Sequence, residues 1–175
     1  IVPATTFVAA DMNFANESPY GQAVYDTLLK ADPDGKVVAS LATEWKYNDS
    51  KTQLDLTLRS DVKFTDGTAF NADAAVQNLK RFQAGSSPNK SFLVNLADAK
   101  AVDPTHLQIT LKQADPGFLN YLTQNAGMMG APSAFTKADA KTNPVGSGPY
   151  ILDPGSTVIG SSYSFTRNPN YWDKA

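Results

Sequence analysis

The only histidine in the chain, His106, is the first residue to weigh as a catalytic base. As the base of a serine-hydrolase triad it would need a nucleophilic serine on a G-x-S-x-G turn, and the sequence contains no such turn. It follows Asp103-Pro104-Thr105, a composition that is typical of a turn between two strands. We therefore expect His106 to be an exposed turn residue and not a base.

Metal and phosphate chemistry lack their usual motifs in this chain. Cysteine is absent, which excludes disulfides, thiolate metal sites and a cysteine nucleophile. One histidine and scattered carboxylates form no recognisable set of metal ligands. Neither G-x-x-x-x-G-K-[ST] nor G-x-G-x-x-G occurs. The sequence predicts no metal site and no cofactor.

Four acids could be imagined as acid and base partners: Glu17, Asp26, Asp66 and Asp73. Nothing in their spacing sets the distance between any two carboxylates. Most of them lie at expected turns or helix starts, where acids serve the backbone. We expect structural roles for all four, with a ligand contact left open for Glu17, and we predict no catalytic residue.

The overall charge excludes further classes of partner. The net charge is -2, the isoelectric point is near 5.3, and no run of lysine or arginine occurs. The chain therefore lacks the basic surface that nucleic acids or anionic membranes attract. No apolar run approaches the roughly 20 residues needed to span a bilayer. No signal peptide opens the chain at Ile1, so we expect a mature form whose leader has been removed.

A site for a small solute needs apolar and aromatic walls with a few oriented polar groups, and three stretches could supply them. The polar loop before residue 20 mixes a ring, two amides and an acid. The G-M-M-G stretch offers methionine, which adapts to varied side chains. The glycine-flanked serine near residue 147 lets backbone approach a ligand closely. The candidate ligand-binding residues are Asn13, Phe14, Asn16, Glu17, Tyr20, Met128, Met129, Ser147 and Gly148.

Each stretch also has a purely structural interpretation. The first could be a surface loop with Phe14 packed into the core. A methionine on a buried strand is commonly a core residue, which applies to at least one of Met128 and Met129. Ser147 and Gly148 could mark a crossover between two lobes.

The elements that must position these residues alternate irregularly between strand and helix. Phe7-Val8-Ala9-Ala10 predicts a buried strand, followed by a loop to residue 20. Ser18 as N-cap and Pro19 as first residue predict a helix over residues 20–30. A sheet is predicted from strands at 44–47, 53–59 and 62–64 and from a hairpin at 99–102 and 107–111. Helices are predicted after the N-cap Asn71, at 92–96, from 115 and from 132, with a strand at 126–131 and a final hairpin within 143–172.

This order lacks the regular β-α-β alternation of a doubly wound sheet, so the fold class is mixed α/β of the α+β kind. Five motifs in this order resemble the family 5 extracellular solute-binding proteins, the peptide and nickel receptors of ABC importers. They are Y-D-T-L-L, S-L-A-T-E-W, L-R-S-D-V-K-F-T-D-G-T-A-F, G-S-G-P-Y and R-N-P-N-Y-W. The resemblance spans nearly the whole chain.

The resemblance implies the N-terminal lobe of a periplasmic-binding-protein type II fold. Residues 1–30 and 145–175 would be pieces of the first ligand-facing lobe. Residues 31–144 would form an inserted α+β domain. The second lobe is absent from this chain, which we expect to be an N-terminal fragment.

The implied function is that of a monomeric receptor that delivers a small solute, foremost a short peptide, to the permease of an ABC transporter. It implies a periplasmic or extracellular location, with a lipid anchor on the outer face of the cell membrane as one arrangement. A ligand-sensing regulatory module on the same fold is the alternative, and a hydrolase is a third hypothesis. Nickel chelates, sugars and opines remain open as ligands.

Overall fold

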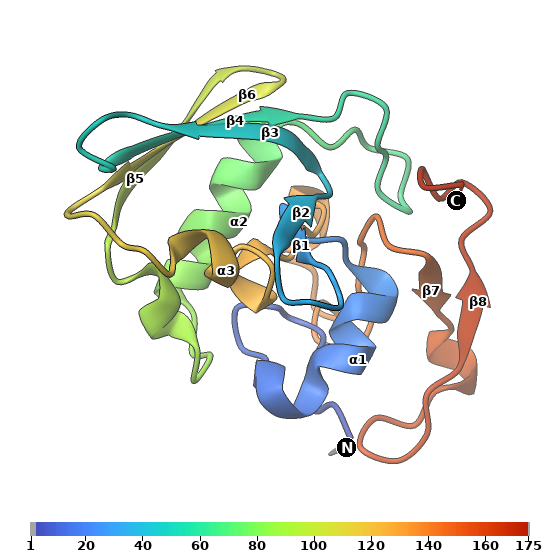
Figure 1. Cartoon of the computed structure of the whole chain (residues 1–175). Coiled ribbons are helices and arrows are strands. Elements are labelled where there is room, and N and C mark those ends of the chain that lie inside the picture. Colours follow the sequence, from blue (N-terminus) through green and yellow to red (C-terminus); the bar gives the residue numbers. More distant parts are fainter. Residues whose placement is uncertain (1–2, 175) are drawn as a thin grey trace.

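The main sheet has four antiparallel strands in the order β3-β4-β6-β5, as Figure 1 shows across the top of the molecule. The structure is a computed structural model that describes residues 3–174. The strands are β3 (Ala42–Tyr47), β4 (Gln53–Leu58), β5 (Leu96–Asp103) and β6 (His106–Leu111). The predicted strands at 44–47 and 53–59 and the predicted hairpin are confirmed within a few residues.

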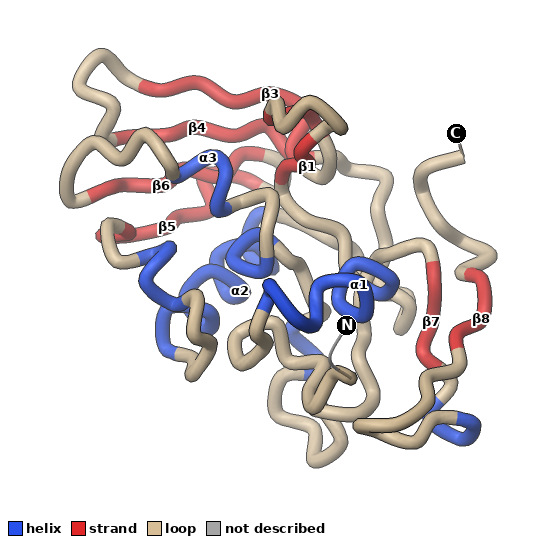
Figure 2. Tube along the Cα trace, turned by 60° about the horizontal axis from the view of Figure 1, so that its bottom comes forward, coloured by secondary structure: helices blue, strands red, loops and turns tan. Residues whose placement is uncertain are grey.

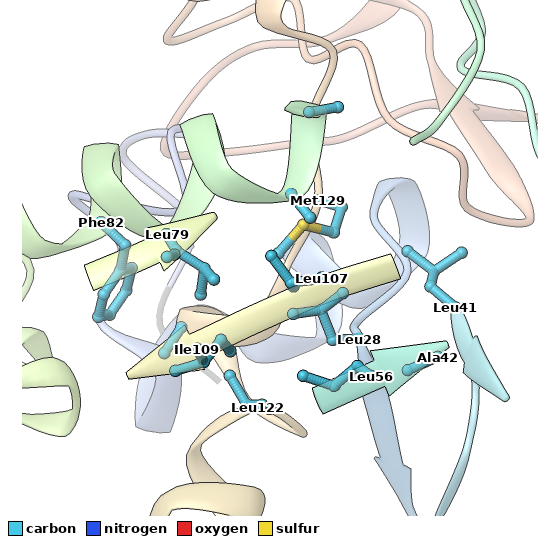
Figure 3. Packing of buried hydrophobic residues seen from close by; sticks show 14 of the residues in the cluster. Leu28, Leu41, Ala42, Leu56, Leu79, Phe82, Leu107, Ile109, Leu122 and Met129 are labelled. Carbon is cyan, nitrogen blue, oxygen red and sulfur yellow. The ribbon is translucent and has the colours of Figure 1, made fainter. Parts of the chain in front are cut away.

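One face of this sheet is apolar because leucines recur at every second residue of β4. Leu54, Leu56 and Leu58 are buried, whereas Asp55 between them is exposed. The helix α2 (Ala72–Ala84) covers this face, and Figure 3 shows its Leu79 and Phe82 against the strand residues Leu107 and Ile109. Each such buried side chain stabilises the fold by about 1.5–3 kcal/mol.

Helix α2 begins where the sequence predicts. Asn71 has extended backbone, and its side-chain oxygen accepts a hydrogen bond from the Ala74 N–H at 2.9 Å. This bond satisfies one of the N–H groups that have no partner inside the first turn.

The remaining elements lie beside the sheet and α2 (Figure 2). They begin with α1 (Phe14–Val24) and the small antiparallel pair β1 (Leu29–Ala31) and β2 (Val37–Ala39). Short helices follow at Lys90–Leu93, α3 (Phe118–Tyr121), Asn125–Gly127 and Pro132–Ala134. The chain closes with the hairpin of β7 (Tyr150–Leu152) and β8 (Phe165–Arg167), with a short helix at Pro154–Ser156 between the two strands.

The first helix was predicted over residues 20–30, and both of these bounds are wrong, because Leu29 and Lys30 belong to β1. Helix α1 begins at Phe14, with Asn13 as its N-cap, and ends at Val24, so Pro19 lies inside it. The buried carboxylate of Glu17 accepts hydrogen bonds from the N–H groups of Thr5 and Asn13 at 2.9 and 2.8 Å. Glu17 thus holds the helix start five residues before the predicted cap, although Pro19 removes one internal hydrogen bond from the helix.

Three predicted strands are also wrong as strands. Residues 7–10 are buried apart from partly exposed Ala9, but have no ladder, and the Phe7 N–H donates to the Lys141 carbonyl at 2.8 Å. Residues 126–131 make only isolated bridges, from Met128 to Thr27 and from Gly130 to Gly146. Residues 62–64 lie outside the four-stranded sheet, with one bridge from Lys63 to Ala69. Burial without a continuous partner strand explains all three, because apolar runs pack in loops as well as in sheets.

Two predicted helices differ in position. The helix expected from residue 115 begins at Phe118, because the Asp115 side chain accepts the Gly117 N–H at 3.0 Å and forms a turn first. The helix expected at 92–96 is a 3-10 turn at Lys90–Leu93, because Leu96 already belongs to β5. The short helix predicted from 132 is confirmed at Pro132–Ala134.

The N-cap of α2 allows a direct test of local stability. Replacing Asn71 with alanine removes the acceptor for the Ala74 N–H, and we expect the free energy of unfolding to fall by about 1 kcal/mol. Urea denaturation followed by circular dichroism measures it. Asn71→Ser keeps a capping oxygen and should stay near the parent value. Equal stability of the alanine and serine variants would contradict the capping role.

Candidate functional site

A buried acid, Asp26, joins three segments that are far apart in the sequence. It lies two residues after the end of α1 and is 3% exposed. One carboxylate oxygen, Oδ2, accepts from Ser147 Oγ and from Trp172 Nε1, each at 2.8 Å. The other, Oδ1, accepts from the Tyr171 hydroxyl at 3.0 Å. We call Asp26, Ser147, Tyr171 and Trp172 the Asp26 cluster.

The electrostatics of the Asp26 cluster reflect its burial. Loss of solvent raises the pKa of Asp26 above its ordinary value of 3.8. The three side-chain hydrogen bonds and the charge of Lys30 act on this pKa in the opposite direction. The Trp172 ring also carries Arg59 at 4.2 Å and Lys30 at 5.4 Å from its centre. The cluster therefore fixes the end of the chain against α1 and β1.

The glycines on either side of Ser147 allow this approach. A Cβ atom on Gly146 would lie 1.9 Å from the Val24 carbonyl oxygen, and one on Gly148 would lie 2.6 Å from the Val24 carbonyl carbon. The Gly148 N–H donates to the same Val24 carbonyl at 3.0 Å. Only glycine lets the returning strand lie this close to the end of α1.

A groove of about 560 Å³ opens beside the Asp26 cluster. Phe14, Tyr171 and Pro149 supply ring surfaces, and Lys30 and Gln124 supply polar groups. The other lining residues are Gln22, Tyr25, Asp26, Thr27, Ala31 and Thr123. The groove thus combines ring surfaces with several polar side chains, and such a combination can orient a small solute that has both apolar and polar groups.

The start of α1 holds the rest of the predicted loop. The Asn13 N–H donates a hydrogen bond to the Glu17 carboxylate, as described for the helix start, and the Phe14 N–H donates to the Asn89 side chain at 3.1 Å. Asn16 is exposed. The Tyr20 ring packs on Tyr163 with 4.4 Å between ring centres. The structure thus makes a helix of the stretch predicted as a loop, with Phe14 as its groove residue.

The two methionines and the glycine-flanked serine are buried. Met128 and Met129 are 2% and 0% exposed, and Met128 packs against the residues around Phe7 and Tyr25. Ser147 is 0% exposed and reaches the groove only through its bond to Asp26. Of the predicted ligand-binding residues, Phe14 lines the groove directly and Ser147 supports its floor.

The sequence analysis assigned Asp26 a structural role but did not identify the residues that donate hydrogen bonds to it. A usable signal exists: an acid within the apolar stretch V-Y-D-T-L-L, matched by a serine, a tyrosine and a tryptophan near the chain end. Buried acids need donors, and these three residue types donate. His106 is exposed as expected, but it is the first residue of β6 and not part of the turn, and its Nδ1 lies 2.7 Å from Asp103 Oδ2.

Comparison with known proteins shows which family this chain belongs to. The model of the bacterial extracellular solute-binding proteins, family 5 Middle, matches residues 36–175. The nickel-binding periplasmic protein of Escherichia coli K12 is 36% identical over 155 residues, covering 85% of this chain and 29% of that protein. The chain belongs to family 5. The glutathione-binding protein GsiB of Escherichia coli K12 is 36% identical over 160 residues, covering 83% of this chain and 31% of GsiB.

The fold of this family 5 chain agrees with a solved relative. The substrate-binding domain of an oligopeptide ABC transporter from Bacillus anthracis superposes with a TM-score of 0.89 at 18% identity, covering 99% of this chain and 37% of that one. The predicted mixed α/β fold class of the periplasmic-binding type II kind is confirmed. The chain spans about a third of the length of the curated relatives it matches.

Two further properties concern residues 3–174 only. No helix among them is both long and apolar enough to cross a membrane. No three His, Asp or Glu side chains among them gather into a group that could hold a metal ion.

The close approach at Gly146 leads to a stability prediction. In Gly146→Ala the new methyl group would overlap the Val24 carbonyl, a backbone atom that cannot rotate away, so we expect a loss of about 3 kcal/mol or more. Gly155→Ala is the matched control, because the nearest atom, Asp153 Oδ1, would lie at 3.4 Å. Thermal and urea unfolding compare the two. Similar losses in both variants would contradict the packing argument.

The raised pKa of Asp26 predicts how stability depends on pH. The folded chain keeps this proton to a higher pH than the unfolded chain, so the stabilisation by Asp26 is full below pH 3.8 and decreases as the pH rises through the raised folded-state value. The difference in unfolding free energy between the parent and Asp26→Asn should therefore narrow over that interval. Urea titrations from pH 3.5 to neutrality measure it. A difference that widens with pH would show that the hydrogen bonds outweigh burial.

Proposed function

We propose that this chain is the N-terminal part of an extracytoplasmic receptor that delivers a short peptide to the permease of an ABC transporter. Membership of family 5 supports the receptor role. The groove beside the Asp26 cluster is the observation that carries the proposal for this chain, because it places ring surfaces next to polar side chains, as a small solute with both kinds of group requires. A peptide is favoured because one relative is named for glutathione, which is itself a peptide.

The proposed receptor acts by selecting a ligand between two lobes. This chain would supply the first lobe from residues 1–30 and 145–175, with residues 31–144 as an inserted domain. The second lobe would follow Ala175 and close over the ligand. The receptor would be a monomer in the periplasm or outside the cell, with or without a lipid anchor, and would perform no chemistry.

The predicted ligand-binding residues differ in how directly they would act on the ligand in this proposal. Phe14 would contact the ligand in the groove. Asn13, Asn16, Glu17 and Tyr20 would shape the start of α1 at its rim. Buried neighbours would fix the groove from behind: Met128, Met129, Ser147 and Gly148.

Nickel is the second candidate ligand, because another relative is named for nickel binding. The residues that this chain itself offers do not favour it. His106 is the only histidine of the chain, and it lies on the far sheet and not at the groove. A nickel ligand would therefore need a chelator or donors from the second lobe.

Native mass spectrometry tests the proposal on a polypeptide that continues through the second lobe and is purified without refolding. We expect a bound mass in the range of a short peptide. A bound nickel chelate or sugar would overturn the peptide assignment. Turnover of a peptide or ester panel that is lost in His106→Ala would overturn the receptor role itself.

The 175-residue chain alone should bind weakly, because half of the cleft is missing. We expect calorimetry with short peptides to show no micromolar affinity. Micromolar affinity of this chain alone would contradict the need for a second lobe.

A further inference from the structure

The groove beside the Asp26 cluster has an uneven distribution of charge. Two charged side chains line it, Asp26 and Lys30. The Asp26 carboxylate is buried, and both of its oxygens already accept hydrogen bonds from the cluster. Lys30 is partly exposed, and no carboxylate of residues 3–174 lies within 4.0 Å of its ammonium group. A ligand entering the groove therefore meets the cation and not the acid.

Lys30 is held in place by its strand and by Trp172. It is the central residue of β1 and pairs with Val38 of β2. Its ammonium group lies 5.4 Å from the centre of the Trp172 ring, and Trp172 is itself bonded to Asp26. An ammonium over an aromatic ring is attracted by the negative face of the ring. The cation is thus positioned beside the groove before any ligand binds.

Two amides in the groove are ready for further hydrogen bonds. The side chains of Gln22 and Gln124 both line it, and neither makes a hydrogen bond to the described part of the chain. An amide both donates and accepts, which matches a peptide bond. Phe14 and Pro149 add apolar surface next to them.

We propose that Lys30 binds the terminal carboxylate of a short peptide, with Gln22 and Gln124 contacting its last peptide bond. The assignment rests on the proposed receptor function and names the end of the ligand that this groove takes. Among residues 3–174, Lys30 is the one cation that lines the groove, and a single lysine suits a singly charged carboxylate better than a doubly charged phosphate, which basic sites usually meet with several donors. The carboxylate would come from a peptide and not from a free small acid, because the two amides and the ring surfaces need more than a carboxylate to fill them.

Nuclear magnetic resonance titration of the 175-residue chain tests this contact. The probes are trialanine with a free carboxylate, trialanine amide and acetate, with the side-chain signals of Lys30, Gln22 and Gln124 as reporters. We expect saturable shifts at these signals with trialanine, with a dissociation constant on the order of millimolar. Trialanine amide should bind about fivefold more weakly or worse, because it lacks the charge.

Two variants make the test specific. Lys30→Gln removes the cation and should weaken trialanine binding by about fivefold while leaving binding of the amide unchanged. Lys36→Gln is the matched control, because Lys36 is exposed in the turn of the same β1–β2 hairpin and does not line the groove. It should bind trialanine as the parent does.

Several results would overturn the assignment. These are equal binding of trialanine and its amide, unchanged binding by Lys30→Gln, acetate binding as tightly as trialanine, or no shifts with any probe. The outcome is separate from that of the receptor proposal. Trialanine binding here with a ligand other than a peptide in the longer protein would leave the groove assignment standing and overturn the peptide assignment of the receptor. A peptide bound to the longer protein, together with unchanged trialanine binding by Lys30→Gln, would support the peptide assignment of the receptor and overturn the assignment of the groove.

Discussion

The structure depends on one buried acid that must be satisfied by donors from elsewhere in the chain. A carboxylate that is 3% exposed is costly unless hydrogen bonds replace its lost water. Asp26 meets this requirement through Ser147, Tyr171 and Trp172. Because these donors lie more than 120 residues further along, the requirement closes the chain on itself and determines where its last segment lies.

The other features of the groove follow from this closure. Bringing Ser147 to Asp26 forces the backbone on both sides of it against the end of α1, and glycine is what fits there. Bringing Trp172 to Asp26 places its ring beneath Lys30 and Arg59. The buried Asp26 therefore determines both the aromatic walls of the groove and the position of its accessible cation, Lys30.

The four-stranded sheet is organised by a different and simpler constraint. Alternating leucines in β4, and Leu107, Ile109 and Leu111 in β6, make one face of these strands apolar, and α2 covers that face. The exposed strand residues Asp55 and His106 lie on or beside its other face and take no part in the groove. The sheet thus stabilises the molecule, whereas the Asp26 cluster shapes the surface proposed to meet a ligand.

The sequence by itself determined the elements whose signals are local: the alternation of β4, the Asn71 cap and the β5–β6 hairpin. It also showed the family through motifs in order along the chain. Only the tertiary structure decided that α1 begins at Phe14, since Glu17 accepts hydrogen bonds from Thr5 and Asn13, and that residues 7–10 and 126–131 pack without a ladder. Above all, it decided the partners of Asp26. The spacing of apolar residues along the sequence shows which face of a helix or strand is buried. A hydrogen bond between Asp26 and Trp172 leaves no such repeating pattern in the sequence, and the two residues come together only in the folded chain.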